Sequence, residues 1–562
     1  MQAGANAIPP EPTTTPSRRS LVALAVILAV AAALRLPTLD SVPPGLNQDE
    51  AANAWNAWCL LKTGTDQTGA PWPIFYYRAL GENRSALFLY FLLPFQAVGG
   101  LNIWTTRLPA ACAGVLTILL VYWVMRRLFD RPAGLAAAAL LAINPAFIQM
   151  GRWGHEGCVT PLLTLAPLAL LLWAGLPLSD RPATPRPWRA LVAGLLIGIC
   201  CYGYPAVRLF VPIYLVGAVL VTAPGWWGLL RTVAGRQTLL TLAIGVAATF
   251  GPLAYMHMTD DAIGKRGSMT WLWKPDDPLA TRVEKVADRY EQHFTAEFLF
   301  RRGDADAIAW TPGFGLLPRY LLPLQVAGLI LLLPQLHRRR AARLVALGVL
   351  LYPAGDLLNW HTSLHALRSS AGLVALILPA AIGVAVPLSY AVSRRLPAVL
   401  LAFSVLLAGL ILPEEGRFLH ASFVERQTLH ETYVGNAVPL RAACEWVRPR
   451  LADVDAVICT TLDMNQPYIV TLVTLGHDPR NWFAEPREFH NDGKWDVYTR
   501  YGRFHFLPEV ERAALLESFA GNGRPDRVVL FLNPAEPLPI PPAATIVGPD
   551  RQPALLIYDV VR

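Results

Sequence analysis

Long apolar runs alternate with short polar loops through the first 413 residues of the chain. Runs of roughly 17–25 apolar residues are long enough to cross a bilayer as helices. We place such segments at residues 20–36, 107–125, 133–150, 157–176, 190–204, 206–223, 238–257, 318–336, 343–360, 370–389 and 396–413. The pattern therefore predicts a polytopic α-helical membrane protein of about eleven spans.

One further apolar stretch, Ala86–Gly100, is too short to be a span. Its apolar part covers roughly 20 Å of helix, whereas the hydrocarbon core is roughly 30 Å thick. A span there would also move every later arginine-rich loop to the other side of the membrane. We predict an interfacial or re-entrant helix instead, within a long first outer loop at 37–106. A second long outer loop covers 258–317.

The pattern changes at Glu414, where long apolar runs stop and charged residues return. Segments with strand-like patterns appear at Asp455–Leu462, Arg527–Asn533 and Ala554–Val561, with helix-like stretches between them. We predict a soluble α/β domain at 414–562, after a transmembrane domain at 20–413 and a disordered cytoplasmic segment at 1–19.

Composition supports a membrane protein, since 54% of the 562 residues are hydrophobic and only 16% are charged. The net charge of +8 comes largely from arginines in the short loops, namely Arg126, Arg127, Arg131, Arg181, Arg186, Arg189, Arg231, Arg236, Arg338, Arg339, Arg340, Arg343, Arg394 and Arg395. Such loops face the cytoplasm. This places the N-terminus inside and the C-terminal domain outside, and it explains the basicity without a nucleic-acid partner. A cleavable signal peptide over the first apolar run remains an alternative.

Two adjacent carboxylates, Asp49 and Glu50, follow the first apolar run in the segment "GLNQDEAANAW". Ionisable groups at membrane level are costly and are functional candidates. The other ionisable residues at the predicted outer boundary are Arg35, Glu82, Arg84, Arg152, His155, Glu156, Arg208, His361, His365 and Arg368. A carboxylate can act as a general base, and arginine matches the geometry of phosphate.

Each candidate also has a structural interpretation. Asp49 could cap a helix, and Glu156 could sit at a helix start where the dipole favours it. Arg208 and Arg368 could reach lipid headgroups. His361 and His365 have a metal-like spacing but no evident third ligand. Asp304 and Asp306 are predicted to be solvated loop charges, and Cys444 and Cys459 could form a disulfide.

The chain resembles the GT-C membrane glycosyltransferases. The acidic pair in the first loop, the stretch Arg107–Gly157 with "RLP" and "RRLFDR", and "YGYPAVRLFVP", "FLFRRGDADA" and "HALRSSAGLVALILPAAIG" carry the resemblance. The nearest branch is the bacterial relatives of dolichyl-phosphate-mannose protein mannosyltransferases, including the aminoarabinose lipid A transferases. The resemblance covers about residues 20–413, and the C-terminal domain matches no family by its sequence pattern.

This resemblance implies an inverting hexosyl or pentosyl transferase of the cell envelope, using a polyprenyl-phosphate sugar donor. Asp49 would be the general base, Glu50 its orienting partner and Glu156 the second acidic residue. Donor phosphate would bind Arg208 and Arg368, with Arg152 and His365 as further candidates. The donor's hydrocarbon tail would lie between spans. No cofactor is implied, and a divalent metal is not indicated.

The acceptor would be a lipid, a glycan or a protein on the outer face of the membrane. Two alternatives remain from other classes of protein. A transporter or flippase of lipid-linked sugars would carry its ionisable groups nearer the bilayer midplane. A receptor with a ligand-binding C-terminal domain would not need so many spans.

Overall fold

The computed structural model describes residues 18–181, 184–260, 272–274, 276–306, 308, 310–359, 364–492, 495–521 and 527–561. Almost all of the predicted disordered segment 1–19 lies outside these residues, and so does His361.

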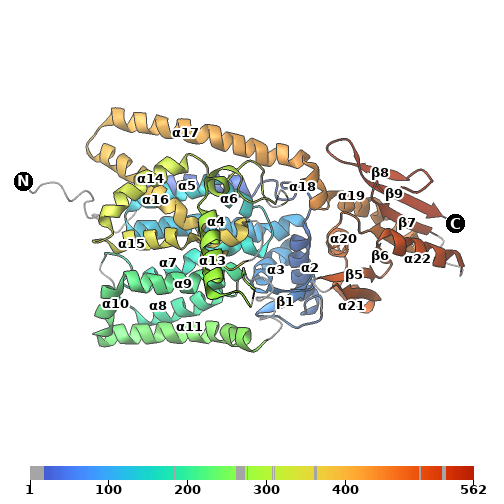
Figure 1. Ribbon diagram of the computed structural model, residues 1–562, viewed down its shortest axis with the longest axis horizontal. Coiled ribbons are helices and arrows are strands. Elements are labelled where there is room, and N and C mark those ends of the chain that lie inside the picture. The colour runs from blue at the N-terminus through green and yellow to red at the C-terminus, as the bar shows by residue number, and fades with distance from the viewer. Residues whose placement is uncertain are drawn as a thin grey trace, which may run out of the picture.

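An elongated helical bundle forms one part of the molecule, and the C-terminal domain covers one end of it (Figure 1). We call this end of the bundle the domain end. The bundle contains α1 (Arg18–Arg35), α4 (Ile103–Leu128), α5 (Arg131–Ile143), α6 (Pro145–Met150), α7 (Thr160–Trp173), α8 (Pro187–Cys200), α9 (Pro205–Val221), α10 (Ala223–Leu230), α11 (Val233–Thr259), α14 (Leu321–Leu332), α15 (Arg340–Leu350), α16 (Ala366–Ser393) and α17 (Pro397–Phe423). Each predicted span overlaps at least one helix.

The predicted number of spans is not confirmed. Among the described residues, five helices are long and apolar enough to cross a membrane, or six if the bent pair α9 and α10 is one span. Several apolar runs are broken within their length. The run 133–150 breaks at Asn144, whose Oδ1 accepts a hydrogen bond from Ala146 N at 3.0 Å and so starts a new helix. The structure is therefore a multi-pass helical bundle with several short apolar helices.

The first loop folds into α2 (Gln48–Thr63), the antiparallel hairpin of β1 (Tyr76–Ala79) and β2 (Glu82–Ser85), and α3 (Leu87–Gly99). Helix α3 has 13 residues and is too short to span, as the sequence predicted. It packs against α2 and α4 at the domain end (Figure 1).

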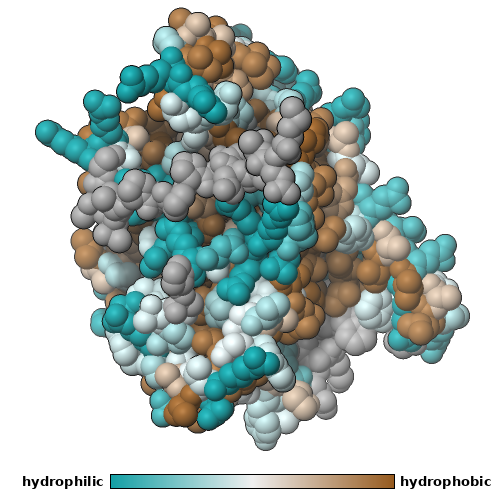
Figure 2. All heavy atoms as spheres, turned by 90° about the vertical axis from the view of Figure 1, so that its left-hand side faces the viewer, coloured by the Kyte–Doolittle hydropathy of each residue, from teal (hydrophilic) through white to brown (hydrophobic). Residues whose placement is uncertain are grey.

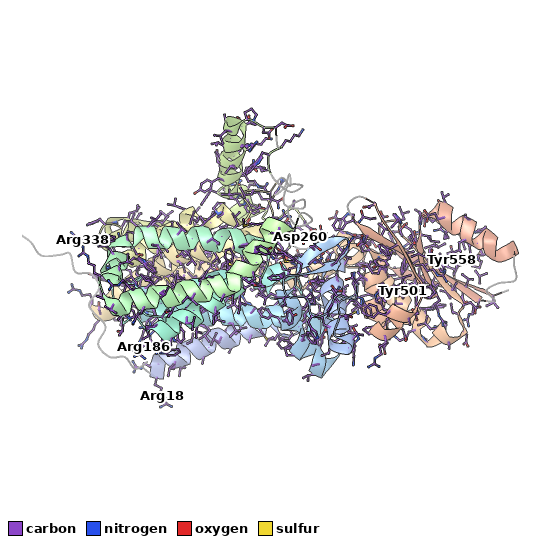
Figure 3. The ribbon with its side chains drawn as sticks, turned by 90° about the horizontal axis from the view of Figure 1, so that it is seen from below. Arg18, Arg186, Asp260, Arg338, Tyr501 and Tyr558 are labelled. Carbon is purple, nitrogen blue, oxygen red and sulfur yellow. The ribbon has the colours of Figure 1, made fainter. Side chains whose placement is uncertain are left out.

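The second long loop contains α13 (Leu279–His293), which stands out from the side of the bundle (Figure 3). Short helical turns connect other elements: η1 (Glu156–Val159), η2 (Glu297–Arg301), η3 (Leu333–Gln335), η4 (Tyr352–Gly355), η5 (Glu425–Thr428) and η6 (Arg448–Asp453).

The C-terminal domain has a seven-stranded mixed sheet in the order β4-β5-β6-β3-β7-β9-β8. Its elements are α18 (His430–Gly435), α19 (Val438–Val447), β3 (Ala456–Thr460), α20 (Pro467–Leu475), α21 (Pro479–Ala484), β4 (Arg487–Asn491), β5 (Asp496–Tyr501), β6 (Phe504–Leu507), α22 (Glu509–Gly521), β7 (Arg527–Leu532), β8 (Ala544–Val547) and β9 (Pro553–Val561). Strands β6, β3 and β7 are parallel, and the outer strands are antiparallel.

The strand-like segments of the sequence correspond to β3, β7 and β9, which confirms the predicted α/β domain. Side chains alternate between faces, so that Val457 and Val529 face the main core while Ile458 and Leu530 pack with α22. The predicted boundary at Glu414 is too early, because α17 continues to Phe423. Both Cys444 and Cys459 are buried free thiols.

The C-terminal domain packs against the first loop. Trp482 packs edge-on against Trp55 of α2 at 6.0 Å between ring centroids, and its Nε1 donates to Gln67 O at 2.9 Å. Gly45 has φ +72°, and a Cβ there would lie 2.1 Å from Asn436 O. Only glycine fits this close approach of two backbones. The residues around Asp49 are thus held between the bundle and the sheet domain.

Candidate active site

Helix α2 begins immediately before the acidic pair. Asn47 is its N-cap, with Oδ1 accepting a hydrogen bond from Asp49 N at 2.8 Å. Glu50 completes a capping box by accepting from Asn47 N at 3.4 Å. The sequence interpretation of Asp49 as the cap is therefore wrong, and its carboxylate is left for other contacts.

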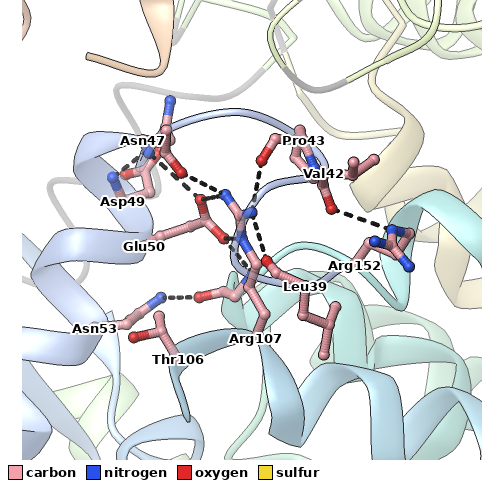
Figure 4. A network of polar contacts seen from close by, with 12 residues as sticks. Leu39, Val42, Pro43, Asn47, Asp49, Glu50, Asn53, Thr106, Arg107 and Arg152 are labelled. Carbon is pink, nitrogen blue, oxygen red and sulfur yellow. Dashed lines mark hydrogen bonds and ion pairs between the residues drawn. The ribbon is translucent and has the colours of Figure 1, made fainter. Parts of the chain in front are cut away.

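Glu50 is fully buried in an ion pair with Arg107 (Figure 4). Both carboxylate oxygens accept hydrogen bonds from the guanidinium, each at 2.8 Å, and Oε1 also accepts from Gly154 N at 2.7 Å. Arg107 gives its remaining hydrogen bonds to backbone oxygens of Leu39, Pro43 and Gly45. Glu50 thus ties α2 to α4 and to the segment after α6, and it has no exposed surface for a substrate.

Asp49 lies in a different environment from its neighbour. Its side chain is 30% exposed, and its Oδ1 accepts a hydrogen bond from Arg84 Nη1 at 2.6 Å. Arg84 Nη2 donates to both oxygens of Glu156 at 2.9 Å, and Asn53 Nδ2 donates to Glu156 Oε2 at 3.0 Å. One guanidinium therefore joins the two acidic residues that the sequence placed in separate loops.

Opposing effects act on the charge of Arg84. Burial lowers the pKa of its guanidinium, but the negative charges of Glu156 and Asp49 outweigh burial and raise this pKa well above its usual value. Arg84 is thus a permanent cation between two carboxylates. A bidentate arginine of this kind fixes the orientation of the carboxylates as well as their charge.

The β1–β2 hairpin places a second arginine beside Arg84. Its turn residues Leu80 and Gly81 have φ +57° and +85°, as a tight two-residue hairpin requires. Ser85, next to Arg84, accepts a hydrogen bond from Arg208 Nη2 at 2.6 Å. Arg208 also donates to Tyr76 OH and lies 4.9 Å from the centre of the Tyr76 ring. Both arginines therefore meet at one hairpin.

Arg368 approaches the same region from α16. It lies beside Tyr204, whose ring lies 5.8 Å from that of His155, next to Glu156. The Nη1 of Arg368 is 3.9 Å from Asp356 Oδ1, and among the described residues it has no hydrogen-bond partner. A half-buried guanidinium with an unused donor is suited to an anionic ligand.

His365 caps α16, with Nδ1 accepting a hydrogen bond from Leu367 N at 3.3 Å. Burial and the charge of Arg368 lower the pKa of the imidazole, so His365 is neutral at neutral pH.

Asp304 is buried and accepts a hydrogen bond from Ala366 N at 2.7 Å, so the prediction of a solvated loop charge is wrong for Asp304. Among the described residues, no group of three His, Cys, Asp or Glu side chains could hold a metal ion.

Arg152 lies apart from the other candidates. Its guanidinium donates to the backbone oxygens of Leu34, Arg35, Pro37, Thr38 and Val42 at the end of α1 and the start of the first loop. It also stacks over the ring of Phe423 at 4.7 Å. These contacts give Arg152 a structural role, and the structure brings together Asp49, Glu156, Arg208 and Arg368 without it.

An apolar groove lies along the bundle below this cluster. It is lined by Thr164, Leu165, Leu168, Phe210, Tyr214, Leu344, Gly348, Ala371, Gly372, Val374, Ala375 and Leu378. These residues come from α7, α9, α15 and α16, and Ala371 is one helical turn from Arg368. The groove has a volume of about 40 Å³, so it has room for only a short part of a hydrocarbon chain.

The sequence analysis did not assign Arg84, Arg107, Tyr204 or Asn53 to the site. Arg84 was noted only as an ionisable residue of the first loop. The signal that could have found it is the Leu80-Gly81 pair between short polar and aromatic stretches, which predicts a hairpin. A hairpin would have placed Arg84 and Ser85 on a rigid element near Asp49.

The comparisons with known proteins agree with the resemblance seen in the sequence. The fold is similar to that of solved structures of GT-C glycosyltransferases. The model of the family described as dolichyl-phosphate-mannose-protein mannosyltransferase matches residues 83–255, which contain Arg84, Glu156 and Arg208.

Two solved structures share the fold over most of the chain. ArnT from Cupriavidus metallidurans bound to undecaprenyl phosphate is similar at 15% identity and a TM-score of 0.54, covering 97% of this chain and 98% of ArnT. The archaeal oligosaccharyltransferase AglB from Archaeoglobus fulgidus, in complex with an inhibitory peptide and a dolichol-phosphate, is similar at 14% identity and a TM-score of 0.51. That alignment covers 81% of this chain and 64% of AglB. A comparison with curated protein sequences gave no match.

Proposed function

We propose that the protein is an integral membrane glycosyltransferase that moves a hexose or pentose from a polyprenyl-phosphate donor to an acceptor hydroxyl or amine. The observation that carries the proposal is the position of Asp49. Its part-exposed carboxylate is held by Arg84 at the end of the bundle where Arg208 and Arg368 also gather. The family match and the lipid phosphates bound by the similar structures support a donor of this class.

In this proposal Asp49 takes the proton of the acceptor as its oxygen or nitrogen attacks the sugar carbon. The bond from that carbon to the phosphate oxygen breaks, and the configuration is inverted. Arg84 orients Asp49 and Glu156, and Glu50 supports α2 from its buried ion pair. Because the leaving group is already a phosphate, the chain needs positioning, a base and cations.

Arg208 and Arg368 would bind the phosphate and stabilise it as it leaves, with His365 as a neutral hydrogen-bonding neighbour. The apolar groove between α7, α9, α15 and α16 would hold the first part of the lipid tail. We propose that these guanidinium groups supply the positive charge and that no cofactor or metal is required. Transfer by the purified protein should then persist in the presence of EDTA.

The active site and the C-terminal domain are proposed to face outward. Arg18, Arg186 and Arg338 lie at the end of the bundle away from the sheet domain (Figure 3). Hydrophilic side chains gather on this end (Figure 2). Basic ends of helical bundles face the cytoplasm, which leaves the domain end outside. The family match and the similar structures offer no support for a lipid-linked sugar transporter.

The test is transfer in proteoliposomes from radiolabelled polyprenyl-phosphate sugars, with membrane extract supplying acceptors. Asp49→Asn should lower the rate by about 10²–10⁴-fold while donor binding persists. Asp40→Asn is the matched control, because Asp40 is an exposed carboxylate of the same loop outside the Arg84 network. Absence of transfer from every donor, or equal transfer by Asp49→Asn, would contradict the proposal.

A further inference from the structure

A second site lies where the sheet domain meets the start of α2. A cavity of about 400 Å³ is lined there by Gln48, Ile308, Val434, Gly435, Ala437, Pro439, Leu440, Thr461, Leu462, Asp463, Met464, Asn465, Pro467, Asn533 and Ala554. Its volume is that of a small-molecule binding site. None of the residues assigned above to the base or to the phosphate lines it.

The position of the cavity in the fold favours ligand binding. Thr461–Asn465 follow β3, and Asn533 follows the neighbouring parallel strand β7. The cavity therefore opens at the carboxyl ends of parallel strands, where open α/β sheets bind their ligands. Two lining residues, Ala437 and Asp463, have φ of +50° and +58°. Left-handed backbone at residues other than glycine is costly and collects at functional sites.

The polar groups of the cavity specify the chemistry of its ligand. Asn465, Asn533 and Gln48 carry amides that both donate and accept hydrogen bonds, and Asp463 is an acceptor. Asp463 accepts from Asn533 Nδ2 at 3.1 Å, so the two are already oriented. Among the described lining residues there is no cation, and the one charged group is a carboxylate. This combination fits an uncharged, hydroxyl-rich ligand and disfavours an anion.

The adjacent start of α2 connects this cavity to the proposed reaction. Gln48 lines the cavity, and the next residue of the chain is Asp49. The opposite wall belongs to the sheet domain, which is seated on the first loop by Trp482 and Gly45. A ligand in the cavity thus lies beside the first turn of α2 that carries Asp49.

We propose that this cavity is the acceptor subsite and that it binds an uncharged carbohydrate. The inference rests on the proposed glycosyltransferase function and adds the class of acceptor, a glycan rather than a peptide or an anionic lipid headgroup. The acceptor sugar would hydrogen-bond to Asp463, Asn465 and Asn533 and pack against Leu462 and Met464. Its reacting hydroxyl would reach Asp49 past Gln48.

The experiment compares variants of the full-length protein in nanodiscs. Asn533→Ala and Asp463→Asn each remove hydrogen bonds to the acceptor, and each should raise the acceptor KM by about tenfold. The donor Kd should be unchanged, because the phosphate-binding arginines are not altered. Asn481→Ala is the control, since Asn481 is an exposed asparagine of the same domain outside the cavity. It should leave both constants unchanged.

Direct binding provides the second readout. Uncharged methyl glycosides and disaccharides should show saturation-transfer NMR signals with the wild type that weaken in Asn533→Ala. Glucuronate and sugar phosphates should show no signal that weakens in Asn533→Ala, because any binding of these anions would be at the arginines outside the cavity. Leu462→Trp adds a large side chain at an exposed lining position, and it should abolish the signal while donor binding persists.

The outcomes separate the two proposals. Transfer by the wild type with an unchanged acceptor KM in the cavity variants would overturn the acceptor subsite and leave the glycosyltransferase proposal intact. Selective binding of glycosides in the cavity without any transfer would overturn the enzymatic proposal and the acceptor role together. Stronger binding of the anionic sugars or of peptides that is lost in Asn533→Ala would overturn the assigned ligand class.

Discussion

At the scale of single residues, Asp49 and Glu50 show how neighbours on one helix acquire different roles. Successive residues of an α-helix point about 100° apart, so one carboxylate turns into the core and the other remains part-exposed. Glu50 meets Arg107 in a fully buried pair, whereas Asp49 meets Arg84 at a position that solvent reaches. The sequence identifies the acidic pair, but the difference between its members depends on packing.

The buried pair leads to a prediction for Glu50→Gln. Removing one charge of a buried ion pair leaves the other uncompensated and costs about 3–5 kcal/mol. We expect Glu50→Gln to lower the melting temperature of the purified protein clearly, whereas Asp49→Asn should leave it nearly unchanged. Scanning fluorimetry of both variants in the same detergent would check this. A Glu50→Gln variant with wild-type stability but no transfer activity would instead indicate a direct chemical role.

A second prediction concerns Arg84. Lysine would keep the positive charge but cannot make the forked contacts that join Asp49 to Glu156. We expect Arg84→Lys to lower kcat by about 100-fold, because a small misplacement of a base is costly, while the donor KM stays close to that of the wild type. Steady-state transfer kinetics would measure both constants. An equal rise in the KM for the donor would show that Arg84 binds the phosphate itself.

The sequence could identify much of this cluster of charged residues, but it could not show which hydrogen bonds join them. Asp49, Glu156, Arg208 and Arg368 are recognisable because charged residues at apolar boundaries are rare. Arg84 and Arg152 looked alike in that respect, yet one joins two carboxylates and the other binds backbone oxygens. Which partners an arginine finds depends on the hairpin and on the end of α1, and these contacts join residues far apart in the chain.

At the scale of elements, the apolar pattern predicted where helices occur better than how long they are. The run 343–360 is predominantly apolar, but α15 ends at Leu350 and a short turn follows. Local breaks are set by proline, by capping side chains and by packing against neighbours, none of which changes the hydropathy of the run. Counting runs therefore overestimated the number of long spanning helices.

The contact between Gly45 and Asn436 gives a prediction about how the two parts of the molecule are held together. Gly45→Ala would place a Cβ 2.1 Å from Asn436 O and should separate the first loop from the segment before α19. We expect reduced transfer and faster proteolysis between α17 and β3. Gly69→Ala is the matched control, since Gly69 also has positive φ, at +93°, but nothing lies within 4 Å of its added Cβ. Equal effects of both substitutions would indicate backbone strain rather than a lost contact.

At the scale of the whole molecule, the site exists because two folded parts meet. The bundle supplies Arg208, Arg368 and the apolar groove, the first loop supplies Asp49 and Arg84, and the sheet domain closes the cavity beside α2. Sequence patterns predicted the bundle and the α/β domain separately. They could not predict the cavity, because its walls come from α2, α19 and the loops after β3 and β7, which no single segment reveals.

The arrangement of charge over the whole molecule predicts its orientation in the membrane. Arginines collect at the end of the bundle away from the sheet domain, and the described native cysteines are buried or half-buried (Figure 3). A single cysteine can therefore be introduced at each end, as Glu509→Cys on α22 and as Arg338→Cys in the basic loop. A membrane-impermeant maleimide should label Glu509→Cys in intact cells and Arg338→Cys only after permeabilisation, because basic loops stay in the cytoplasm. The wild type provides the background for both. Labelling of Arg338→Cys in intact cells would reverse the orientation and place the proposed transfer reaction on the cytoplasmic face.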